Sequence, residues 1–366
     1  MKDFRAPGEQ LAEERSWAVV QRAYESREPV AWPRRHARPL VAGALVAAAV
    51  AAALSPPGRS VIHSLRKAVG VEHAQRELFS LPAPGRLLVS GPGGAWIVNP
   101  DGSRRRLGAY RDAAWSPHGL FVAATRQNEL VALDPKGNVR WTLPRRSPRF
   151  PAWTGTRADT RIAYLAGGRL HIVAGDGTDD RTVALAAPVA PVWRPGPGRV
   201  LAYAHGRRAV VYDADSGVVL LRTKPGKAPR RLEWSTDGRL LLVFAPHQVR
   251  VFDARGRVVA RDEPSGATAD ADAAFVPGTH RLAAIRVHGF ESEVFLFGRG
   301  KPLFGGTGVF HQLVWAPNGR WLLVTWPTAN QWVFVRPKPR KIVGASRIAA
   351  QFGGFPRTAS WCCGAR

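Results

Sequence analysis

A chain of 366 residues, 45% of them hydrophobic, is long enough to bury a sizeable core, which excludes wholesale disorder. Its 53 Lys and Arg against 27 Asp and Glu give a net charge of +26, which attracts anions such as nucleic acid, anionic lipid or wall polymers; a basic surface without a specific partner is the equal alternative. The two cysteines, Cys362 and Cys363, are adjacent. This excludes a disulfide framework and a thiolate metal site, and no bond between them is expected.

The first 38 residues are predicted to form a cytoplasmic tail with a short amphipathic helix. Within residues 8–28, Trp17, Val20 and Tyr24 recur at the spacing of one helical face. A weakly ordered tail is the favoured interpretation, because a single helix of this length needs a partner or the membrane surface to be stable; the alternative is that this face docks a cytoplasmic protein.

Residues 40–54, LVAGALVAAAVAAAL, carry no charge and predict a transmembrane signal anchor over 39–56. A buried core helix and a cleavable signal peptide are the alternatives. Basic residues are denser before this stretch than after it, which places the N-terminus in the cytoplasm and the remainder outside a bacterial cell membrane. Residues 57–84 are predicted to form a juxtamembrane linker helix.

From residue 85 the chain repeats with a period near 40, which is typical of a β-propeller. One aromatic residue marks each repeat, at successive spacings of 38, 40, 41, 41 and 40: Trp115, Trp153, Trp193, Trp234, Phe275 and Trp315. We expect each aromatic to end a short strand and to fill the space between neighbouring sheets.

A turn such as SPHG, STDG or APNG follows the aromatic, and Gly119, Gly238 and Gly319 in these turns are expected to adopt positive φ. Two apolar strands, an Asp-rich turn and a basic edge segment complete four strands per repeat.

Residues 85–108 form a unit without its first strand. We expect residues 345–355, ASRIAAQFGGF, to supply it, with Phe352 in the aromatic position. Closing the ring with strands from both ends removes free sheet edges. The fold class is therefore an all-β propeller of seven blades over residues 85–355, or of six with an irregular tail. Residues 356–366 are predicted to form a C-terminal tail.

The pattern W-S-P-x-G, then a strand, then a D-x-x-G turn resembles the TolB-type, WD-repeat-like propeller repeat of bacteria. The chain also resembles single-span propeller proteins of actinobacterial type. This resemblance covers residues 85–355 and implies a membrane-tethered scaffold or sensor.

Ser116 and His118 have the spacing of a nucleophile and its base, but the matching positions in other repeats hold Ser235 and Asp237. A catalytic pair needs a third orienting group, which no repeat supplies. We expect a protein that is not an enzyme and has neither cofactor nor metal. A propeller hydrolase or quinoprotein is the alternative.

The predicted function is binding of a protein or of an anionic polymer or lipid outside the membrane. The candidate contacts for an anion are clustered arginines: Arg104, Arg105, Arg106, Arg230 and Arg231. Nucleic acid is disfavoured by this location, and no small-molecule substrate is expected. The alternative is a membrane regulator, similar to anti-sigma factors, whose tail binds a transcription factor.

Overall fold

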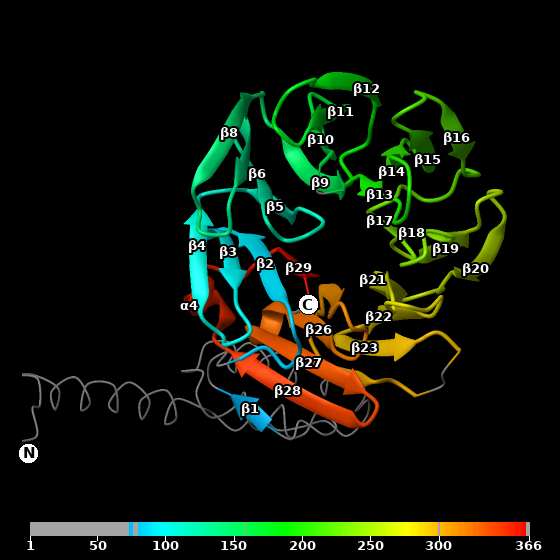
Figure 1. Cartoon of the computed structure of the whole chain (residues 1–366). Coiled ribbons are helices and arrows are strands. Elements are labelled where there is room, and N and C mark those ends of the chain that lie inside the picture. Colours follow the sequence, from blue (N-terminus) through cyan, green and yellow to red (C-terminus); the bar gives the residue numbers. More distant parts are fainter. Residues whose placement is uncertain (1–72, 76–79, 157, 299–300, 364–366) are drawn as a thin grey trace, which may run out of the picture. The chain divides into compact units, whose positions relative to one another are not determined.

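The computed structural model describes residues 73–75, 80–156, 158–298 and 301–363, all of which lie in the unit Gly58–Arg366. Seven antiparallel sheets surround a common axis, and each forms one blade of the ring (Figure 1). Each blade has four strands, with the first at the axis and the fourth at the rim. The predicted fold of seven four-stranded blades is therefore confirmed.

The strands are given blade by blade, from the axis outward. Blade 1 contains β29 (Thr358–Cys362), β2 (Arg86–Gly91), β3 (Gly94–Val98) and β4 (Arg104–Gly108); blade 2 contains β5 (Asp112–Trp115), β6 (Val122–Arg126), β7 (Glu129–Leu133) and β8 (Val139–Pro144). Blade 3 contains β9 (Arg149–Gly155), β10 (Thr160–Ala166), β11 (Arg169–Ala174) and β12 (Arg181–Leu185); blade 4 contains β13 (Val192–Trp193), β14 (Val200–His205), β15 (Arg208–Asp213) and β16 (Val219–Arg222).

Blade 5 contains β17 (Arg231–Trp234), β18 (Leu241–Ala245), β19 (Gln248–Phe252) and β20 (Val258–Asp262); blade 6 contains β21 (Thr268–Phe275), β22 (Leu282–His288), β23 (Glu291–Leu296) and β24 (Phe304–Thr307). Blade 7 contains β25 (Gln312–Trp315), β26 (Leu322–Trp326), β27 (Gln331–Pro337) and β28 (Arg340–Ser346), and β1 (His73–Gln75) adds to its rim, parallel to β28.

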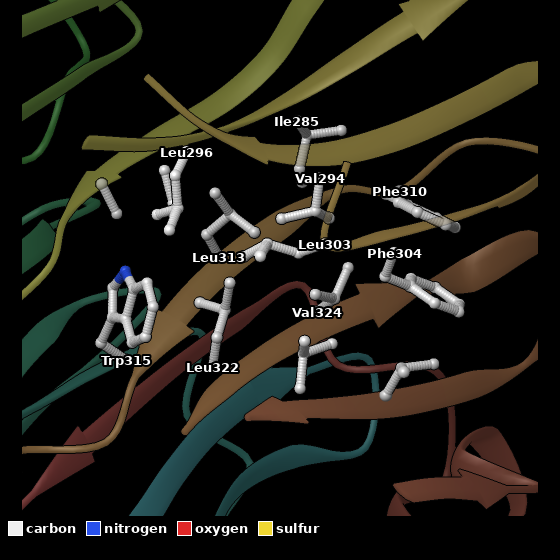
Figure 2. Packing of buried hydrophobic residues seen from close by; sticks show 14 of the residues in the cluster. Ile285, Val294, Leu296, Leu303, Phe304, Phe310, Leu313, Trp315, Leu322 and Val324 are labelled. Carbon is white, nitrogen blue, oxygen red and sulfur yellow. The ribbon is translucent and has the colours of Figure 1, made fainter. Parts of the chain in front are cut away.

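The core lies between neighbouring blades, which explains why the second strands are continuously apolar. All five residues of β18 are buried, because this strand is covered on both faces by adjacent blades. The rim strand β20 of the same blade is largely exposed. Figure 2 shows the packing between blades 6 and 7, where Ile285 and Val294 meet Leu313 and Val324.

The marker aromatics end or nearly end the inner strands, and two of them hydrogen-bond the blade before. The indole N–H of Trp193 donates to the carbonyl of Ala152 at 3.0 Å, and that of Trp234 donates to the carbonyl of Val192 at 3.2 Å. In both cases the acceptor is the residue that precedes the aromatic of the preceding blade. Trp115, Phe275 and Trp315 are buried, whereas Trp153, Trp193 and Trp234 are half-buried.

The turns after the aromatics have the predicted backbone. Gly119, Gly238 and Gly319 have φ values of 63°, 68° and 65°. In the first turn the buried hydroxyl of Ser116 accepts the Phe121 N–H at 2.9 Å, so this serine stabilises the turn. His118 is exposed beside it.

The predicted closing strand is wrong. Residues 340–346 form the rim strand of blade 7, and a short helix, α4 (Ile348–Phe352), follows. The inner strand of blade 1 is β29, which lies within the predicted C-terminal tail. The helix lengthens this connection beyond the regular repeat, so a constant period selects Phe352 instead of the true aromatic, Trp361.

In blade 1 the inner-strand residue Trp361 lies opposite Leu87 of the second strand. Trp115 lies opposite Val122 in the same way in blade 2, so Trp361 occupies the position of the marker aromatic. Its indole N–H donates to the carbonyl of Pro84 at 3.2 Å. Phe352 is buried instead between two other aromatics, with ring centroids 5.9 Å from Trp96 and 5.1 Å from Trp332.

The chain before the ring differs from the predicted linker helix wherever it is described. Residues 73–75 form β1, whose backbone groups pair with the edge of β28. No helix in the described part of the chain is long and apolar enough to cross a membrane. The predicted anchor (39–56) and the predicted docking face, Trp17, Val20 and Tyr24, lie outside the described residues.

Cys362 and Cys363 are joined by a disulfide, which corrects the expectation of no bond. Cys363 has a φ of 59° and leaves the extended conformation in which successive side chains point to opposite faces. The disulfide lies against Gly119, where a Cβ atom would collide with the sulfur of Cys363.

Replacing Trp361 with Ala is expected to lower the free energy of unfolding by about 3–5 kcal/mol, because it empties the aromatic position that closes the ring. Urea unfolding measures this change. Leu120→Ala is the control: this residue is 53% exposed, and its change is expected within about 0.5 kcal/mol. Equal effects of the two substitutions would contradict the role of Trp361.

Candidate functional site: two opposite faces of the ring

The antiparallel order of the blades sorts every connection onto one of two faces. The loop face carries the connections between second and third strands and those between blades: 92–93, 109–111, 127–128, 145–148, 167–168, 186–191, 206–207, 223–230, 246–247, 263–267, 289–290, 308–311, 327–330 and 347–357. The turn face carries the other turns: 99–103, 116–121, 134–138, 156–159, 175–180, 194–199, 214–218, 235–240, 253–257, 276–281, 297–303, 316–321 and 338–339.

The two faces differ in charge. Among the described residues, the turn face holds ten basic and nine acidic residues. The loop face holds a single acidic residue, Glu263, and nine basic residues: Arg111, Arg145, Arg146, Arg207, Lys224, Lys227, Arg230, Arg347 and Arg357. Of the two faces, the loop face therefore carries nearly all of the net positive charge.

The basic side chains of the loop face are largely free of carboxylate partners. Arg145 is half-buried and pairs with Asp180. The other eight are exposed, and no described carboxylate lies within 4.0 Å of any of them. Such unpaired charges attract a polyanion strongly, because binding releases the counter-ions of both partners.

Of the predicted anion contacts, Arg230 lies on this face but Arg231 does not act there. The Arg231 guanidinium lies 2.6 Å from the Asp272 carboxylate and 2.5 Å from that of Glu233. Burial lowers the pKa of Arg231, but these two carboxylates outweigh it and raise the value overall, so the residue stays charged. Burial raises the pKa of Glu233.

This ion-pair network holds inner strands together. Asp272 of β21 accepts the backbone N–H of Leu313 in β25 at 2.8 Å, and Glu233 of β17 accepts that of Phe275 in β21 at 2.9 Å. Inner strands of different blades share no sheet ladder, so these side chains supply hydrogen bonds that the backbone lacks. Arg231 is therefore a structural residue.

The remaining predicted contacts, Arg104, Arg105 and Arg106, are exposed on β4, the rim strand of blade 1. Arg106 donates from Nε to the carbonyl of Gly93 at 3.0 Å. Arg230 lies across the ring, in the connection between blades 4 and 5, so the structure does not gather the five arginines into one patch.

Sequence reasoning missed most of the loop face because its charges are scattered along the chain. Arg111, Arg230 and Arg357 each stand directly before an inner strand, and this shared position is the signal that would have revealed them. A single arginine between two strands forms no cluster in the sequence, so the shared position becomes visible only when the repeats are aligned.

The turn face is hollowed where blades 2 to 5 meet. One hollow, of about 580 Å³, lies between blades 2 and 3 and is lined by Trp141 and Trp153. A second, of about 520 Å³, lies between blades 3 and 4 and shares Trp153 and Asp159 with the first. A third of about 520 Å³ follows between blades 4 and 5 and shares Arg194 with the second.

Charges around the hollows are mostly paired. Arg140 lies 3.0 Å from Asp134, and Arg257 lies 2.8 Å from Asp253. Hydrogen bonds from Asn138 hold the pKa of Asp134 below its usual range. In the described ranges, no three His, Cys, Asp or Glu side chains form a group that could hold a metal ion.

Comparison with known proteins gives the fold. No protein-family profile and no curated protein matches the chain. Among solved structures it is similar to hydrazine synthase of Kuenenia stuttgartiensis, with a TM-score of 0.51 and 14% identity over 62% of this chain and 76% of that one. It is also similar to the β-propeller domain of Myceliophteria thermophila Cps50 (Swd1), with a TM-score of 0.50 and 14% identity over 65% and 86%. The fold is a seven-bladed β-propeller.

The expectation that the protein is not an enzyme is corrected by this comparison. Hydrazine synthase is an enzyme, and the similarity extends over 76% of its chain. A propeller therefore does not exclude catalysis, because function depends on the site that a fold carries and not on the fold itself.

Asp270 is a buried carboxyl of blade 6 that makes stability depend on pH. Its side chain is fully buried, and Oδ1 lies 3.4 Å from Nε of Arg286. Burial raises the pKa of Asp270 from 3.8 to about 6. A raised pKa in the folded state means that protonation favours folding, so this carboxyl costs stability as the pH rises from 4 to 6.

Asp270→Asn is expected to remove this dependence. The unfolding free energy of the wild type relative to the variant should fall by about 2 kcal/mol between pH 4 and pH 6, and by a few tenths of a kcal/mol more by pH 7. Urea unfolding at four pH values in this range, with both proteins measured side by side, provides the test. A difference that does not change with pH would mean that the Asp270 carboxyl is not desolvated.

Proposed function

We propose that the protein is a binding scaffold whose loop face attaches to an anionic lipid surface. The observation that carries the proposal is the uneven charge of the two faces, with nine basic residues against one acidic residue on the loop face. A rigid ring fixes these side chains in a plane, and connections displayed by a rigid scaffold are the usual sites of binding.

The exposed basic side chains are spread over the face. Arg111, Arg230 and Arg357 precede inner strands, and Lys224 and Lys227 lie in the same connection as Arg230. Charges within one connection add their fields where they lie within the Debye length, which is about 10 Å at 0.1 M salt, whereas those of distant connections would contact the lipid surface at separate points. Basic residues near an anionic membrane contribute about 1 kcal/mol each.

An exposed apolar pair on the same face favours lipid over a soluble polymer. Phe290 is 79% exposed and Val309 is 45% exposed. The Gly308 N–H donates to the carbonyl of Phe290 at 2.6 Å and holds the two connections side by side. The pair lies on blade 6, away from the basic connections, so it would contact the lipid at a separate point of the same face. Apolar side chains insert beneath lipid headgroups, whereas a wall polymer offers them no apolar layer.

We further propose that residues 39–56 tether the ring to the cell membrane, with the tail inside and the ring outside, as a scaffold or sensor of the TolB-like kind. The uncharged run 40–54 and the repeat pattern support this proposal.

Reversing three charges on the loop face is expected to weaken binding to anionic vesicles by at least about 100-fold, because each basic residue contributes about 1 kcal/mol. The variant is Lys224→Glu, Lys227→Glu and Arg230→Glu in the unit Gly58–Arg366, which lacks the apolar run. Flotation with phosphatidylcholine vesicles, with and without phosphatidylglycerol, measures the affinity.

The matched control reverses three exposed charges on the turn face: Lys136→Glu, Arg281→Glu and Arg320→Glu. It changes net charge equally and should weaken binding little. An equal loss in both variants would show that net charge, and not the loop face, binds lipid. Binding of soluble polyphosphate without binding of vesicles would identify a polymer as the partner instead.

The orientation is tested with alkaline phosphatase, which is active outside the bacterial cytoplasm. A fusion after residue 366 is expected to be active, because Arg34, Arg35 and Arg38 precede the apolar run; a fusion after residue 38, which ends before that run, is the inactive control. An inactive enzyme after residue 366 would contradict the proposed location.

A further inference from the structure

The hollow between blades 2 and 3 is built from aromatic rings and small residues. Phe121, from the turn after β5, stacks on Trp153 of the next blade with ring centroids 6.2 Å apart and an interplanar angle of 22°. Trp141 on the rim strand β8 also lines the hollow. At about 580 Å³, the hollow falls within the size range of small-molecule sites.

Trp141 is held in a fixed orientation across the boundary between the blades. Its indole N–H donates to the carbonyl of Gly175 at 2.8 Å. Beneath it lies Gly177, where an added Cβ would stand 2.9 Å from Cδ2 of the indole. The equivalent residue of blade 4 is Leu221, which pairs with Val211 as Trp141 pairs with Ala132. The aromatic wall is therefore particular to blade 2.

The polar groups at the edge of the hollow comprise both donors and acceptors. Arg140 uses one Nη2–H on Asp134 and leaves Nε and Nη1 without a described partner. Asp176 uses Oδ1 for the backbone and hydroxyl of Thr178 and leaves Oδ2 without a described partner. A hydroxyl group donates and accepts at once, so it matches this pair of groups.

Charge argues against an ionic ligand. The described lining holds two guanidiniums, of Arg140 and Arg161, and two carboxylates, of Asp159 and Asp176, and Arg161 pairs with Asp159 at 2.5 Å. A single-stranded nucleic acid would need a groove of excess positive charge in addition to the stacking rings. An organic cation would be repelled by the guanidiniums of Arg140 and Arg161 in the lining. A neutral ring that bears hydroxyl groups satisfies the apolar walls and the polar edge together.

The adjoining hollow extends the same features. It shares Trp153 and Asp159 with the first and adds Trp193 from the following blade. Two hollows with an aromatic wall between them suit a ligand of several linked rings. We propose that blades 2 to 4 bind a neutral oligosaccharide along the turn face, with one sugar ring in the hollow of Trp141 and the next beyond Trp153.

The test is calorimetric titration of the full chain, in a detergent without a sugar headgroup, with four neutral hexasaccharides: maltohexaose, cellohexaose, xylohexaose and chitohexaose. At least one should bind with a Kd of about 1 mM or tighter, and Trp141→Ala should weaken it at least about tenfold. Leu221→Ala is the matched control and should leave binding unchanged. Phe121→Ala, at a residue that is 37% exposed, repeats the test if Trp141→Ala does not fold.

Two further measurements separate this site from the proposed lipid face. Binding should persist in 0.5 M salt, since screening acts on charges, and in the Lys224→Glu, Lys227→Glu and Arg230→Glu variant. No binding of any hexasaccharide, binding insensitive to Trp141→Ala, or binding of the oligonucleotide dT12 in place of the sugars would overturn the proposal.

Discussion

The pairing of β29 with β2 is the interaction on which the rest of the ring depends. It joins residues 358–362 to residues 86–90 and completes blade 1 from the two ends of the described chain. Blades 2 to 6 are each formed by four consecutive strands, whereas this pairing, together with that of β1 with β28, joins the beginning of the described chain to its end. The cores on both sides of blade 1 include residues of β29 or its neighbour β2. Loss of the pairing would expose two strand edges, which a closed ring avoids.

The repeats could be predicted from the sequence because every blade must bury both of its faces, and this requires the same residue types at the same positions. An aromatic at the end of the inner strand, a glycine with positive φ and a continuously apolar second strand recur wherever a blade must be covered on both faces. The single error in the ring came where the chain departs from this rule. Helix α4 inserts Phe352 between Trp96 and Trp332, and an inserted segment cannot be detected by a fixed period.

The candidate sites were less accessible to sequence reasoning. Clusters such as RRR at 104–106 are conspicuous in the chain but lie on one rim strand, whereas the loop face is assembled from single residues supplied by many blades. Arg231 lies next to Arg230 in sequence, yet it is bound by Glu233 of its own strand and by Asp272 of the neighbouring inner strand. The hollow at Trp141 depends on Gly175 and Gly177 of the following blade, and only the folded structure brings these residues together.

The strands of the blades also set the distance between the two faces. A second strand of five or six residues, such as β6 or β14, spans the ring from the turn face to the loop face. At about 3.3 Å per residue this is roughly 17–20 Å, or twice the Debye length at 0.1 M salt. We therefore expect the two proposed ligands, which would lie on opposite faces, neither to touch nor to repel one another. In that case occupancy of one face would leave the affinity of the other unchanged, and the ring would act as a spacer without the energetic coupling of an allosteric switch.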